Sequence, residues 1–596
     1  MRKNMKKIVT LWMALMSLLT VQACVKKAQP AVVSSPIAVI VMDTTQALLN
    51  GAEVKIGKQT WTTSFDGRVV LKPEQLEGVK SLNISCEGYE DLKVQEFKGF
   101  KEFKEFKEFK ESTLIVRLTP KPGKVTKHDR YYATGALRYA ARDGEAVFAT
   151  MATADMRMDA AVEMEEEAAI APMAKGFGGT MEANNNVSAG KLTAGEVNDF
   201  TKWYFWPNVL DSTHQAFVKE WRIEPRERYT VQVVNKAGYP VVNYPVNLTD
   251  TKGNTIFQAV TDNTGKAELW GNLMANGRKA NGEWKEGLNT LVVDEPCEAP
   301  EGVDVVFVFD ATGSMGDELH YLQAEMKDVI ARAKAATGGL NIRTGAVVYR
   351  DHSDEYLTRI SRLTDDIATT QQFIDKQQAS GGGDYEEAVP EALMAALNSA
   401  GWDSNARARI AFLILDAPCH QDSATLALLH EQILNAAAQG VRIVPVVCSG
   451  LGKSGEYLLR SIALATNGTS FFLTDDSGIG YTHLKPTTDS LKVEHLNDML
   501  VRTIVEFSAM PRCEAFDESD APDVAEQFVP NPFSAQELEQ HPEIPHGEGV
   551  HYLLDVSGKL LGIHYGEVKT TGLPIGVYFI KTYYNDRWYT EKILIK

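Results

Sequence analysis

The chain has 596 residues, 44% of them hydrophobic and 23% charged, so it is too long for one hydrophobic core and should fold as roughly three to five domains. Its formal net charge is −18 at pH 7. No concentrated basic face is visible in the sequence, which argues against a nucleic acid as its partner.

The N-terminus has the pattern of an export signal, which we assign to residues 1–23. Basic residues at positions 2, 3, 6 and 7 precede an apolar run, Ile8–Val21, that is too short to span a bilayer comfortably. Val21-Gln22-Ala23-Cys24 follows and resembles the lipobox of bacterial lipoproteins, although Gln22 departs from its tightest form. The resemblance implies that Cys24 is lipidated and that residues 24–35 tether the protein to the outer membrane or cell surface. Ordinary cleavage, which would leave Cys24 as a free thiol, is the alternative.

Residues 36–120 predict an all-β domain. Short apolar segments surround an Asp-Gly turn at Asp66-Gly67, and a Gly-Tyr pair follows at 88–89. This order resembles the carboxypeptidase-regulatory-like β-sandwich and implies that fold. A Phe-Lys-Glu triplet repeats over Phe97–Glu111 with a period that fits neither a strand face nor a helix stripe. We interpret it as a lengthened loop, with a membrane-touching segment as the alternative.

Residues 121–195 predict a disordered linker, because they are rich in Met, Ala, Glu, Gly and Asn and contain little that could pack. Residues 196–296 begin with a segment carrying Trp203 and Trp206, which we expect to dock one domain on another. They continue as a second β-sandwich, whose strand–turn–strand pattern at 260–269 repeats the pattern at 63–71.

From Asp304 the pattern changes to buried strands that alternate with helices. Continuous apolar runs lie at 305–309, 344–349, 410–415 and 441–447, and this alternation predicts a doubly wound, Rossmann-like α/β domain. Ligands bind at the carboxyl ends of the strands in such sheets. Side chains with hard oxygen ligands follow two of these strands, namely Asp310, Thr312 and Ser314 after the first and Asp416 after the third. They favour Mg²⁺ as the ion, with Mn²⁺ or Ca²⁺ as alternatives.

Asp384 ends a glycine-rich loop, Ser380–Asp384, and is the fifth candidate ligand. The alternative is that Asp384 caps a helix beginning near Tyr385. His352 and His420 also follow strands, and we interpret them as solvated loop histidines.

Together, the Asp-x-Thr-x-Ser sequence, the glycine loop and the strand-end aspartate resemble the metal-ion-dependent adhesion site of von Willebrand factor A domains, over residues 297–513. The resemblance implies that the hydroxyls bind the metal directly, that Asp416 acts through water, and that a carboxylate of the partner completes the coordination. Many members carry threonine where this chain has Gly383-Asp384. Should Asp384 coordinate, three carboxylates and a divalent ion leave a negative site. We therefore expect tight metal retention and weak binding of an acidic partner group.

The same resemblance places both ends of the domain opposite the metal, which implies a disulfide between Cys297 and Cys513. Cys419 and Cys448 lie near the metal edge. For these two, a bridge and a pair of buried free thiols both remain open.

Residues 514–596 predict an acidic linker and a last β-domain. Asn531-Pro532-Phe533, Gly558-Lys559 and Leu573–Ile580 resemble the C-terminal sorting domain of type IX secretion cargo from Bacteroidetes. The stretch between Phe533 and Tyr552 is short and polar where cargo domains carry strands. A lipobox and a sorting domain would also compete to hold the protein, so either the tail is a relic β-sandwich or Cys24 is not lipidated.

The sequence contains no readable nucleophile–base pair. We therefore predict a non-enzymatic, metal-ion-dependent adhesion or scaffold protein at the bacterial surface, with a protein or a surface polymer as its ligand. A metal-dependent enzyme or accessory subunit is one alternative, and it would need a second metal or a base, for which only His352 and His420 are candidates. An assembly factor of the secretion or gliding machinery is the other.

Overall fold

The computed structural model describes residues 36–121, 188–514 and 529–595, apart from short gaps at 77–78, 80, 96–103, 106–111, 202, 204–205, 207–210, 338–339, 489–490, 510, 512, 530, 534, 541, 543, 557 and 571–572. The predicted signal peptide, Cys24 and its tether, most of the Phe-Lys-Glu repeat and most of the predicted linker lie outside these residues. Within them, no helix is both long and apolar enough to cross a membrane.

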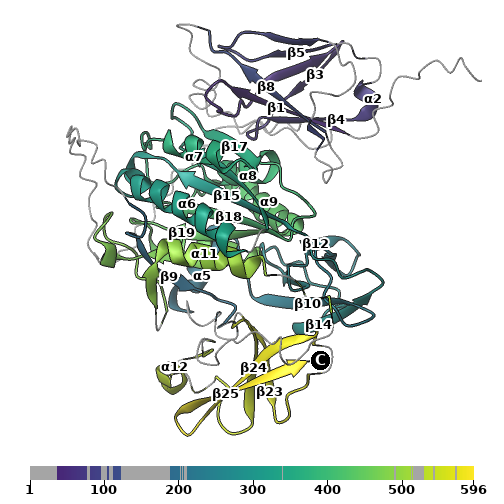
Figure 1. Ribbon diagram of the computed structural model, residues 1–596, viewed down its shortest axis with the longest axis vertical. Coiled ribbons are helices and arrows are strands. Elements are labelled where there is room, and N and C mark those ends of the chain that lie inside the picture. The colour runs from purple at the N-terminus through teal and green to yellow at the C-terminus, as the bar shows by residue number, and fades with distance from the viewer. Residues whose placement is uncertain are drawn as a thin grey trace, which may run out of the picture.

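The described parts are stacked in a column (Figure 1). An N-terminal β-domain lies at one end, a large α/β domain follows, and a second and a C-terminal β-domain occupy the other end. The α/β domain therefore has neighbours on two sides.

The N-terminal domain consists of two four-stranded sheets, in the orders β4-β1-β8-β7 and β3-β2-β5-β6. Their apolar faces share one core, to which Val39, Val41, Val54 and Ile84 contribute. The elements are β1 (Ile37–Asp43), β2 (Glu53–Ile56), β3 (Gln59–Thr62), β4 (Arg68–Leu71), α2 (Pro73–Leu76), β5 (Ser81–Ser85), β6 (Leu92–Gln95), β7 (Lys104–Glu105) and β8 (Ser112–Leu118).

The α/β domain is built on an eight-stranded sheet in the order β17-β16-β15-β18-β19-β20-β9-β21. The five neighbouring strands β16, β15, β18, β19 and β20 are parallel. β17 and β9 run antiparallel to them, and the last strand, β21, pairs antiparallel with β9. The strands are β15 (Gly302–Asp310), β16 (Asn341–Tyr349), β17 (Thr358–Thr364), β18 (Ala408–Leu415), β19 (Val441–Val447), β20 (Ser470–Leu473), β9 (Thr193–Val197) and β21 (Val493–His495).

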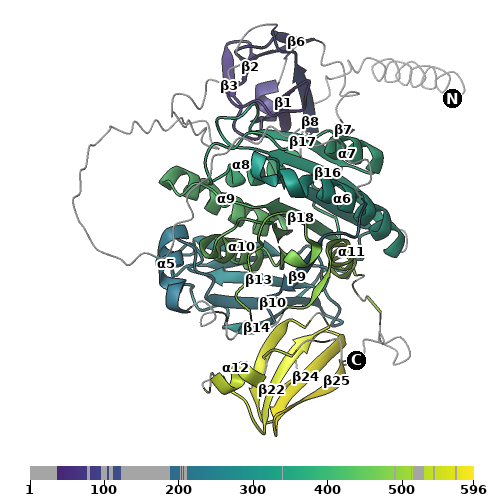
Figure 2. The same ribbon diagram turned by 90° about the vertical axis from the view of Figure 1, so that its left-hand side faces the viewer.

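Helices cover both faces of this sheet, as the continuous apolar strands predict (Figure 2). Val305 and Phe307 of β15 pack against one helix layer, whereas Val306 and Val308 pack against the other. The first layer is α6 (Gly316–Ala336), α7 (Ile367–Asp375) and α11 (Leu496–Phe507), and the second is α8 (Val389–Ser399), α9 (Ser423–Gln439) and α10 (Lys453–Ala465). This arrangement is the predicted doubly wound fold.

The edge strand β17 is covered by the N-terminal domain. The backbone N–H of Leu48 donates to the carbonyl of Thr358 at 3.0 Å, and that of Ile360 donates to the carbonyl of Gln46 at 3.0 Å. The loop after β1 therefore satisfies backbone groups that an exposed sheet edge would leave unpaired.

The other end of the sheet differs from the predicted domain boundary. Residues 193–195 were expected to belong to the linker, but they form the start of β9, which pairs with β20 and β21. The buried carboxylate of Glu325 accepts hydrogen bonds from the backbone N–H groups of Gly190, Lys191 and Leu192, at 2.8 to 3.2 Å. Backbone hydrogen bonds therefore hold residues 190–195 against the α/β domain, and the amino-acid composition of this segment does not predict them.

The second β-domain packs directly on the α/β domain. Trp206 and Trp221 are buried in a core that is continuous with α10, and the indole N–H of Trp221 donates to the Ser454 hydroxyl at 2.8 Å. The elements of this domain are α5 (Asp211–Trp221), β10 (Glu227–Asn235), β11 (Pro245–Thr249), β12 (Thr255–Val260), β13 (Lys266–Gly271) and β14 (Gly287–Val293). Trp203 packs edge-on against Trp270 at the same junction, with 5.1 Å between ring centroids.

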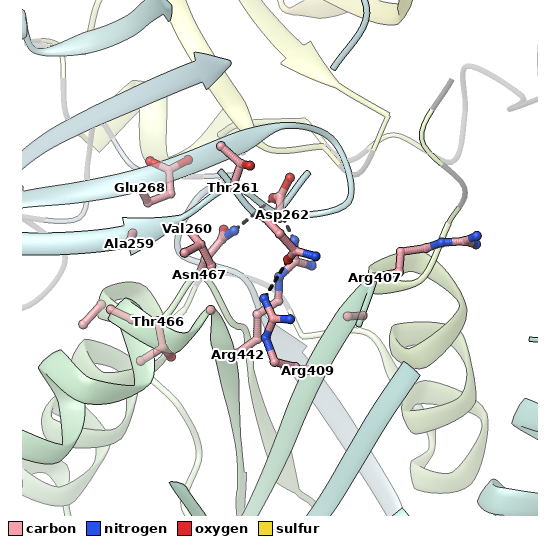
Figure 3. A pocket seen from close by; sticks show the side chains of 15 residues that line it. Ala259, Val260, Thr261, Asp262, Glu268, Arg407, Arg409, Arg442, Thr466 and Asn467 are labelled. Atoms are coloured by element: carbon pink, nitrogen blue, oxygen red, sulfur yellow. Dashed lines mark hydrogen bonds and ion pairs between the residues drawn. The ribbon is translucent and has the colours of Figure 1, made fainter. Parts of the chain in front are cut away.

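Charged side chains also join this domain to the amino ends of the parallel strands. Figure 3 shows Asp262 between Arg442 and Asn467. The Asp262 carboxylate forms an ion pair with the Arg442 guanidinium at 2.7 Å and accepts a hydrogen bond from the Asn467 amide at 3.0 Å. Arg442 lies in the second position of β19, so this junction is on the edge of the sheet opposite the carboxyl ends of the strands.

The C-terminal domain is a four-stranded antiparallel sheet in the order β23-β22-β24-β25. It is anchored to the second β-domain by the ion pairs Lys266–Asp555 and Lys559–Glu268, the latter at 2.6 Å. Its elements are α12 (Ala535–Gln540), β22 (Val550–Asp555), β23 (Leu560–Tyr565), β24 (Gly576–Tyr584) and β25 (Arg587–Ile595).

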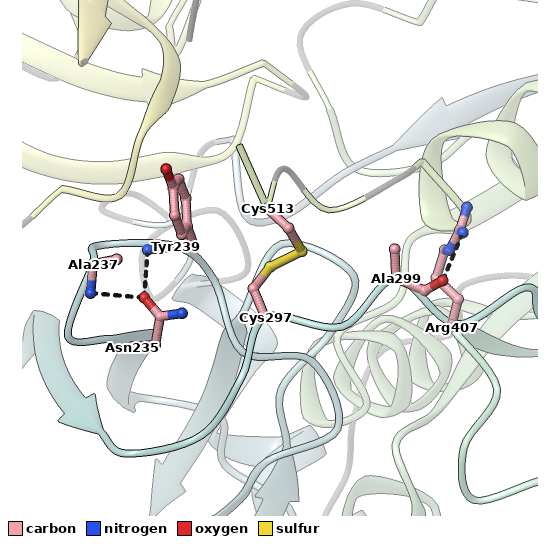
Figure 4. Close-up of a disulfide and its surroundings, with 7 residues drawn as sticks. All are labelled: Asn235, Ala237, Tyr239, Cys297, Ala299, Arg407 and Cys513. Atoms are coloured by element: carbon pink, nitrogen blue, oxygen red, sulfur yellow. Dashed lines mark hydrogen bonds between the residues drawn. A yellow bond between two sulfur atoms is a disulfide. The ribbon is translucent and has the colours of Figure 1, made fainter. Parts of the chain in front are cut away.

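A disulfide joins Cys297 to Cys513, which stand 216 residues apart in the sequence (Figure 4). Cys297 precedes β15 and Cys513 follows α11, so the bridge joins the two ends of the segment that runs from β15 to α11. Cys419 and Cys448 do not form the second bridge that the sequence left open, because both are buried free thiols.

Candidate metal centre

The Asp-x-Thr-x-Ser loop folds tightly at the carboxyl end of β15. Asp310 is the last residue of that strand, and its side chain is fully buried. Its Oδ1 atom accepts hydrogen bonds from the backbone N–H of Thr312 at 2.8 Å and from the Thr312 hydroxyl at 2.7 Å. The Ser314 hydroxyl lies 3.3 Å from that of Thr312. One carboxylate and two hydroxyls are therefore gathered in one short loop.

Asp416 reaches the same place from the neighbouring strand. It follows β18 directly, and β18 pairs in parallel with β15. Burial and the charge of Asp416 raise the pKa of Asp310 to about 7, and burial raises the pKa of Asp416 to about 6, against a hydrogen bond with Ser314 that lowers it. The two carboxylates therefore repel each other in a buried environment.

The residues present fit a divalent cation. The Oδ2 atom of Asp310 and the Oδ1 atom of Asp416 are buried and have no hydrogen-bond partner. Buried carboxylate oxygens normally have a hydrogen-bonding or ionic partner, and a cation would supply one while offsetting the repulsion. A donor set made only of carboxylate and hydroxyl oxygens suits Mg²⁺.

Glu387 is a further acidic residue of this centre, and the sequence analysis missed it. Its side chain is 2% exposed, and its Oε2 atom is buried without a hydrogen-bond partner. A Cβ atom added at Gly382 would lie 3.0 Å from Glu387 Oε1 and 3.2 Å from Thr312 Cβ, so the glycine allows these two side chains to approach. Burial and the charges of Asp310 and Asp351 raise the pKa of Glu387 to about 10.

Asp384, the predicted fifth ligand, lies in a neighbouring cluster of side chains. It is exposed, and its carboxylate lies with ligand atoms of Asp351 and His420, all within 4.8 Å of one another. Asp384 is also not a helix cap, because α8 begins only at Val389, with a proline in its first turn. The sequence did contain a signal for Glu387, namely an acidic residue just before helix α8. It was overlooked because the Gly383-Asp384 pair lies close by in the sequence.

His352 and His420 are not the solvated loop histidines that we expected. Nε2 of His352 lies 2.8 Å from Oε1 of the buried Glu391, and Nε2 of His420 lies 3.1 Å from Oδ1 of Asp351. The two rings stack with 5.8 Å between centroids. Burial lowers the pKa of His352, but the hydrogen bond with Glu391 and the charges of Glu391 and Asp351 together outweigh burial and raise it. The hydrogen bond with Asp351 is the main cause that raises the pKa of His420. Both imidazoles are thus held in place by carboxylates.

Two more groups position the loops around the centre. Arg350 donates to the carbonyls of Ala311 and Gln378, at 3.2 Å and 2.8 Å. Glu318 is buried and accepts from the backbone N–H of Ser449 at 3.1 Å and contacts Nε2 of His483 at 2.9 Å. The Arg350 guanidinium is therefore hydrogen-bonded to backbone carbonyls. The negative charge of Glu318 raises the pKa of Asp416.

Comparison with known proteins identifies the class of this domain. Residues 304–475 match the family described as the von Willebrand factor A domain. The chain therefore contains a von Willebrand factor A domain of α/β fold, and this match includes every residue of the centre described above.

Individual relatives share only part of the chain. An ariadne-like RING finger protein of Acanthamoeba polyphaga mimivirus is 34% identical over 121 residues, which are 20% of this chain and 12% of that protein. An alpha-protein kinase of Dictyostelium discoideum is 31% identical over 124 residues, which are 20% of this chain and 19% of that protein. The chain thus matches only a small part of either relative's length.

Two solved structures are similar over the same share of the chain. The protein BatB from Bacteroides thetaiotaomicron, described as a conserved hypothetical protein, has 16% identity and a TM-score of 0.23, with 35% of this chain and 99% of that chain covered. A von Willebrand factor type A protein from Catenulispora acidiphila has 18% identity and a TM-score of 0.23, with 35% and 42% covered.

Proposed function

We propose that this chain is a metal-ion-dependent binding protein that docks a polypeptide or a surface polymer at the carboxyl edge of its von Willebrand factor A sheet. The observation that carries the proposal is the pair of buried, unpartnered carboxylate oxygens on Asp310 and Asp416. A bound Mg²⁺ would supply a Lewis-acidic position to which a carboxylate of the partner can bind.

The protein's own residues would hold and orient that ion. Asp310 fixes the Thr312 hydroxyl through the 2.7 Å hydrogen bond, and Ser314 follows in the same turn. Glu387 lies beside Thr312 and adds a third buried carboxylate to those of Asp310 and Asp416. A bound cation would favour the ionised form of Glu387, and three carboxylates around one divalent ion would retain the metal tightly and weaken the attraction for an acidic partner.

Exposed aromatic side chains on neighbouring loops support a docking role. Tyr385, which follows the glycine-rich loop directly, is 47% exposed, and its hydroxyl donates to the carbonyl of Gly450 at 3.2 Å. Tyr481 is 70% exposed and follows Gly480, which packs against the Glu318 carboxylate. Tyrosines of this kind are enriched where proteins bind one another.

We further propose that the protein is exported and held at the cell surface through Cys24, and that it is not an enzyme. The basic and apolar N-terminal sequence and the disulfide between Cys297 and Cys513 support export, because such bridges persist in oxidising compartments.

Capture of partners from surface extracts tests the binding role. The immobilised wild-type chain should retain the same proteins or polymers in Mg²⁺ and lose them in EDTA, and Asp310→Asn should fail to retain them in either. Asp294→Asn is the matched control, because Asp294 is exposed and forms an ion pair with the equally exposed Lys236. Retention that survives both EDTA and Asp310→Asn would contradict the proposal.

A further inference from the structure

Three side chains from three separate loops converge next to the first centre. Asp351 lies two residues after β16, Asp384 ends the glycine-rich loop, and His420 follows β18. Each offers one ligand atom, and these atoms lie within 4.8 Å of one another. Parallel strands and a glycine loop thus bring two carboxylates and an imidazole to one point.

The imidazole is oriented within this cluster. Nε2 of His420 points to Asp351 Oδ1 at 3.1 Å, and the ring of His352 stacks on its face. His352 is in turn fixed by Glu391, which is 1% exposed. Glu391 thus fixes the ring against which His420 stacks, and His420 is positioned through that contact.

A separate observation indicates that a cation belongs here. Glu387 is almost fully buried and its Oε2 atom has no partner. The backbone of Glu387 pairs with that of Cys419, the residue before His420, and its N–H donates to the carbonyl of Pro418 at 2.9 Å, so Glu387 lies beside the loop that carries His420. Arg350, the nearby cation, is bound to backbone carbonyls.

We propose that Asp351, Asp384 and His420 bind a second divalent cation beside the oxygen-only centre at Asp310 and Asp416. This cation belongs to the metals that accept an imidazole nitrogen as a ligand, and Zn²⁺ is the first candidate. Imidazole suits zinc and its transition-metal neighbours, whereas Mg²⁺ and Ca²⁺ prefer oxygen. The two adjacent centres therefore select different metals.

Zn²⁺ bound by three protein side chains keeps a coordination position for water or for a group of the partner. Binding requires the unprotonated imidazole, so the proton of His420 is released to solvent as the ion binds.

The test is a titration of the chelator-treated full chain with Zn²⁺ in saturating Mg²⁺, followed by calorimetry and by metal analysis after gel filtration. The wild type should bind one Zn²⁺ per chain. His420→Ala and Asp384→Asn should each weaken Zn²⁺ binding by at least about tenfold while Mg²⁺ binding is kept. His320→Ala is the matched control, because His320 is an exposed histidine on α6.

Two outcomes would overturn the proposal. One is that no Zn²⁺ binds in saturating Mg²⁺, or that it binds equally to His420→Ala and Asp384→Asn. The other is that Asp416→Asn abolishes Zn²⁺ binding while His420→Ala does not, which would place the zinc in the first centre. Co²⁺ in place of Zn²⁺ adds a visible spectrum that should change on loss of the His420 nitrogen, and circular dichroism verifies that each variant is folded.

Discussion

Asp310 and Asp416 end neighbouring parallel strands, and each keeps one buried carboxylate oxygen without a hydrogen-bond partner. Two such groups destabilise a metal-free protein, because buried like charges repel and neither oxygen is solvated. The arrangement is therefore suited to a bound cation more than to the stability of the empty fold.

Replacing Asp310 by Asn tests this relationship directly. The variant keeps the shape of the side chain and removes one buried charge, so without metal it should be at least as stable as the wild type. Mg²⁺ should raise the melting temperature of the wild type but not that of Asp310→Asn, because ligand binding stabilises only the state that binds. Differential scanning calorimetry with Mg²⁺ and with EDTA measures both effects. Equal Mg²⁺ stabilisation of the two proteins would exclude Asp310 as a ligand.

Substitutions of Glu387 and of Asp384 should change the affinity for Mg²⁺ by different amounts. Glu387→Gln removes a carboxylate beside Thr312 and is expected to weaken Mg²⁺ binding by roughly tenfold or more. Asp384→Ala should leave it within about twofold, because Asp384 lies with Asp351 and His420. Isothermal titration distinguishes the two, and the reverse order would restore Asp384 as the ligand that the sequence indicated.

Glu268 should contribute stability that depends on pH. Burial alone would raise its pKa, but the charges of Arg228 and Lys559 outweigh burial and lower the pKa to about 2. A carboxyl group with a lowered pKa stabilises the folded state above its unfolded pKa of 4.5, and this stability is lost as the pH falls toward 2.

Glu268→Gln should accordingly cost about 3–5 kcal/mol at pH 7, because it leaves buried cations without their partner. The difference from the wild type should shrink as the pH is lowered from 4.5 toward 2. Urea denaturation at a series of pH values measures this difference in the free energy of unfolding. Asp294→Asn is the control, because it removes the carboxylate of an exposed ion pair. A difference that stayed constant across this range would show that the charge of Glu268 is not its cause.

Removing the disulfide should destabilise the α/β domain strongly. The bridge closes a loop of 216 residues, which on the chain-entropy account corresponds to about 5 kcal/mol. The double variant Cys297→Ser with Cys513→Ser is expected to unfold at lower urea, and dithiothreitol should lower the wild type to a similar midpoint. Cys419→Ser serves for comparison, since its thiol is not in a bridge.

The sequence predicted the parts of the fold and the site that depend on local pattern. The apolar runs indicated buried parallel strands, and Asp310 and Asp416 follow from the rule that ligands gather at the carboxyl ends of such strands. Glu387 could not be found in this way. Its place depends on Gly381 and Gly382, which have φ angles of +82° and +76°, and on the hydrogen bond from its backbone N–H to the carbonyl of Pro418.

Strand β9 was missed for a related reason. Its residues have no strong strand pattern, and they join the sheet because β20 and β21 offer backbone groups on either side. A partner so distant along the chain leaves no trace in a local window of sequence.

Strand β9 also affects the order in which the domain can fold and where an expression fragment should begin. The hydroxyl of Thr469 donates to the carbonyl of Val197, 272 residues earlier, so β9 leaves the ribosome long before the edge that will receive it. A fragment that starts at Cys297, where the sequence pattern placed the start of the domain, would leave β20 without its partner β9, and an unpaired edge strand can pair with another copy. An expression fragment beginning near Gly190 would keep the sheet closed.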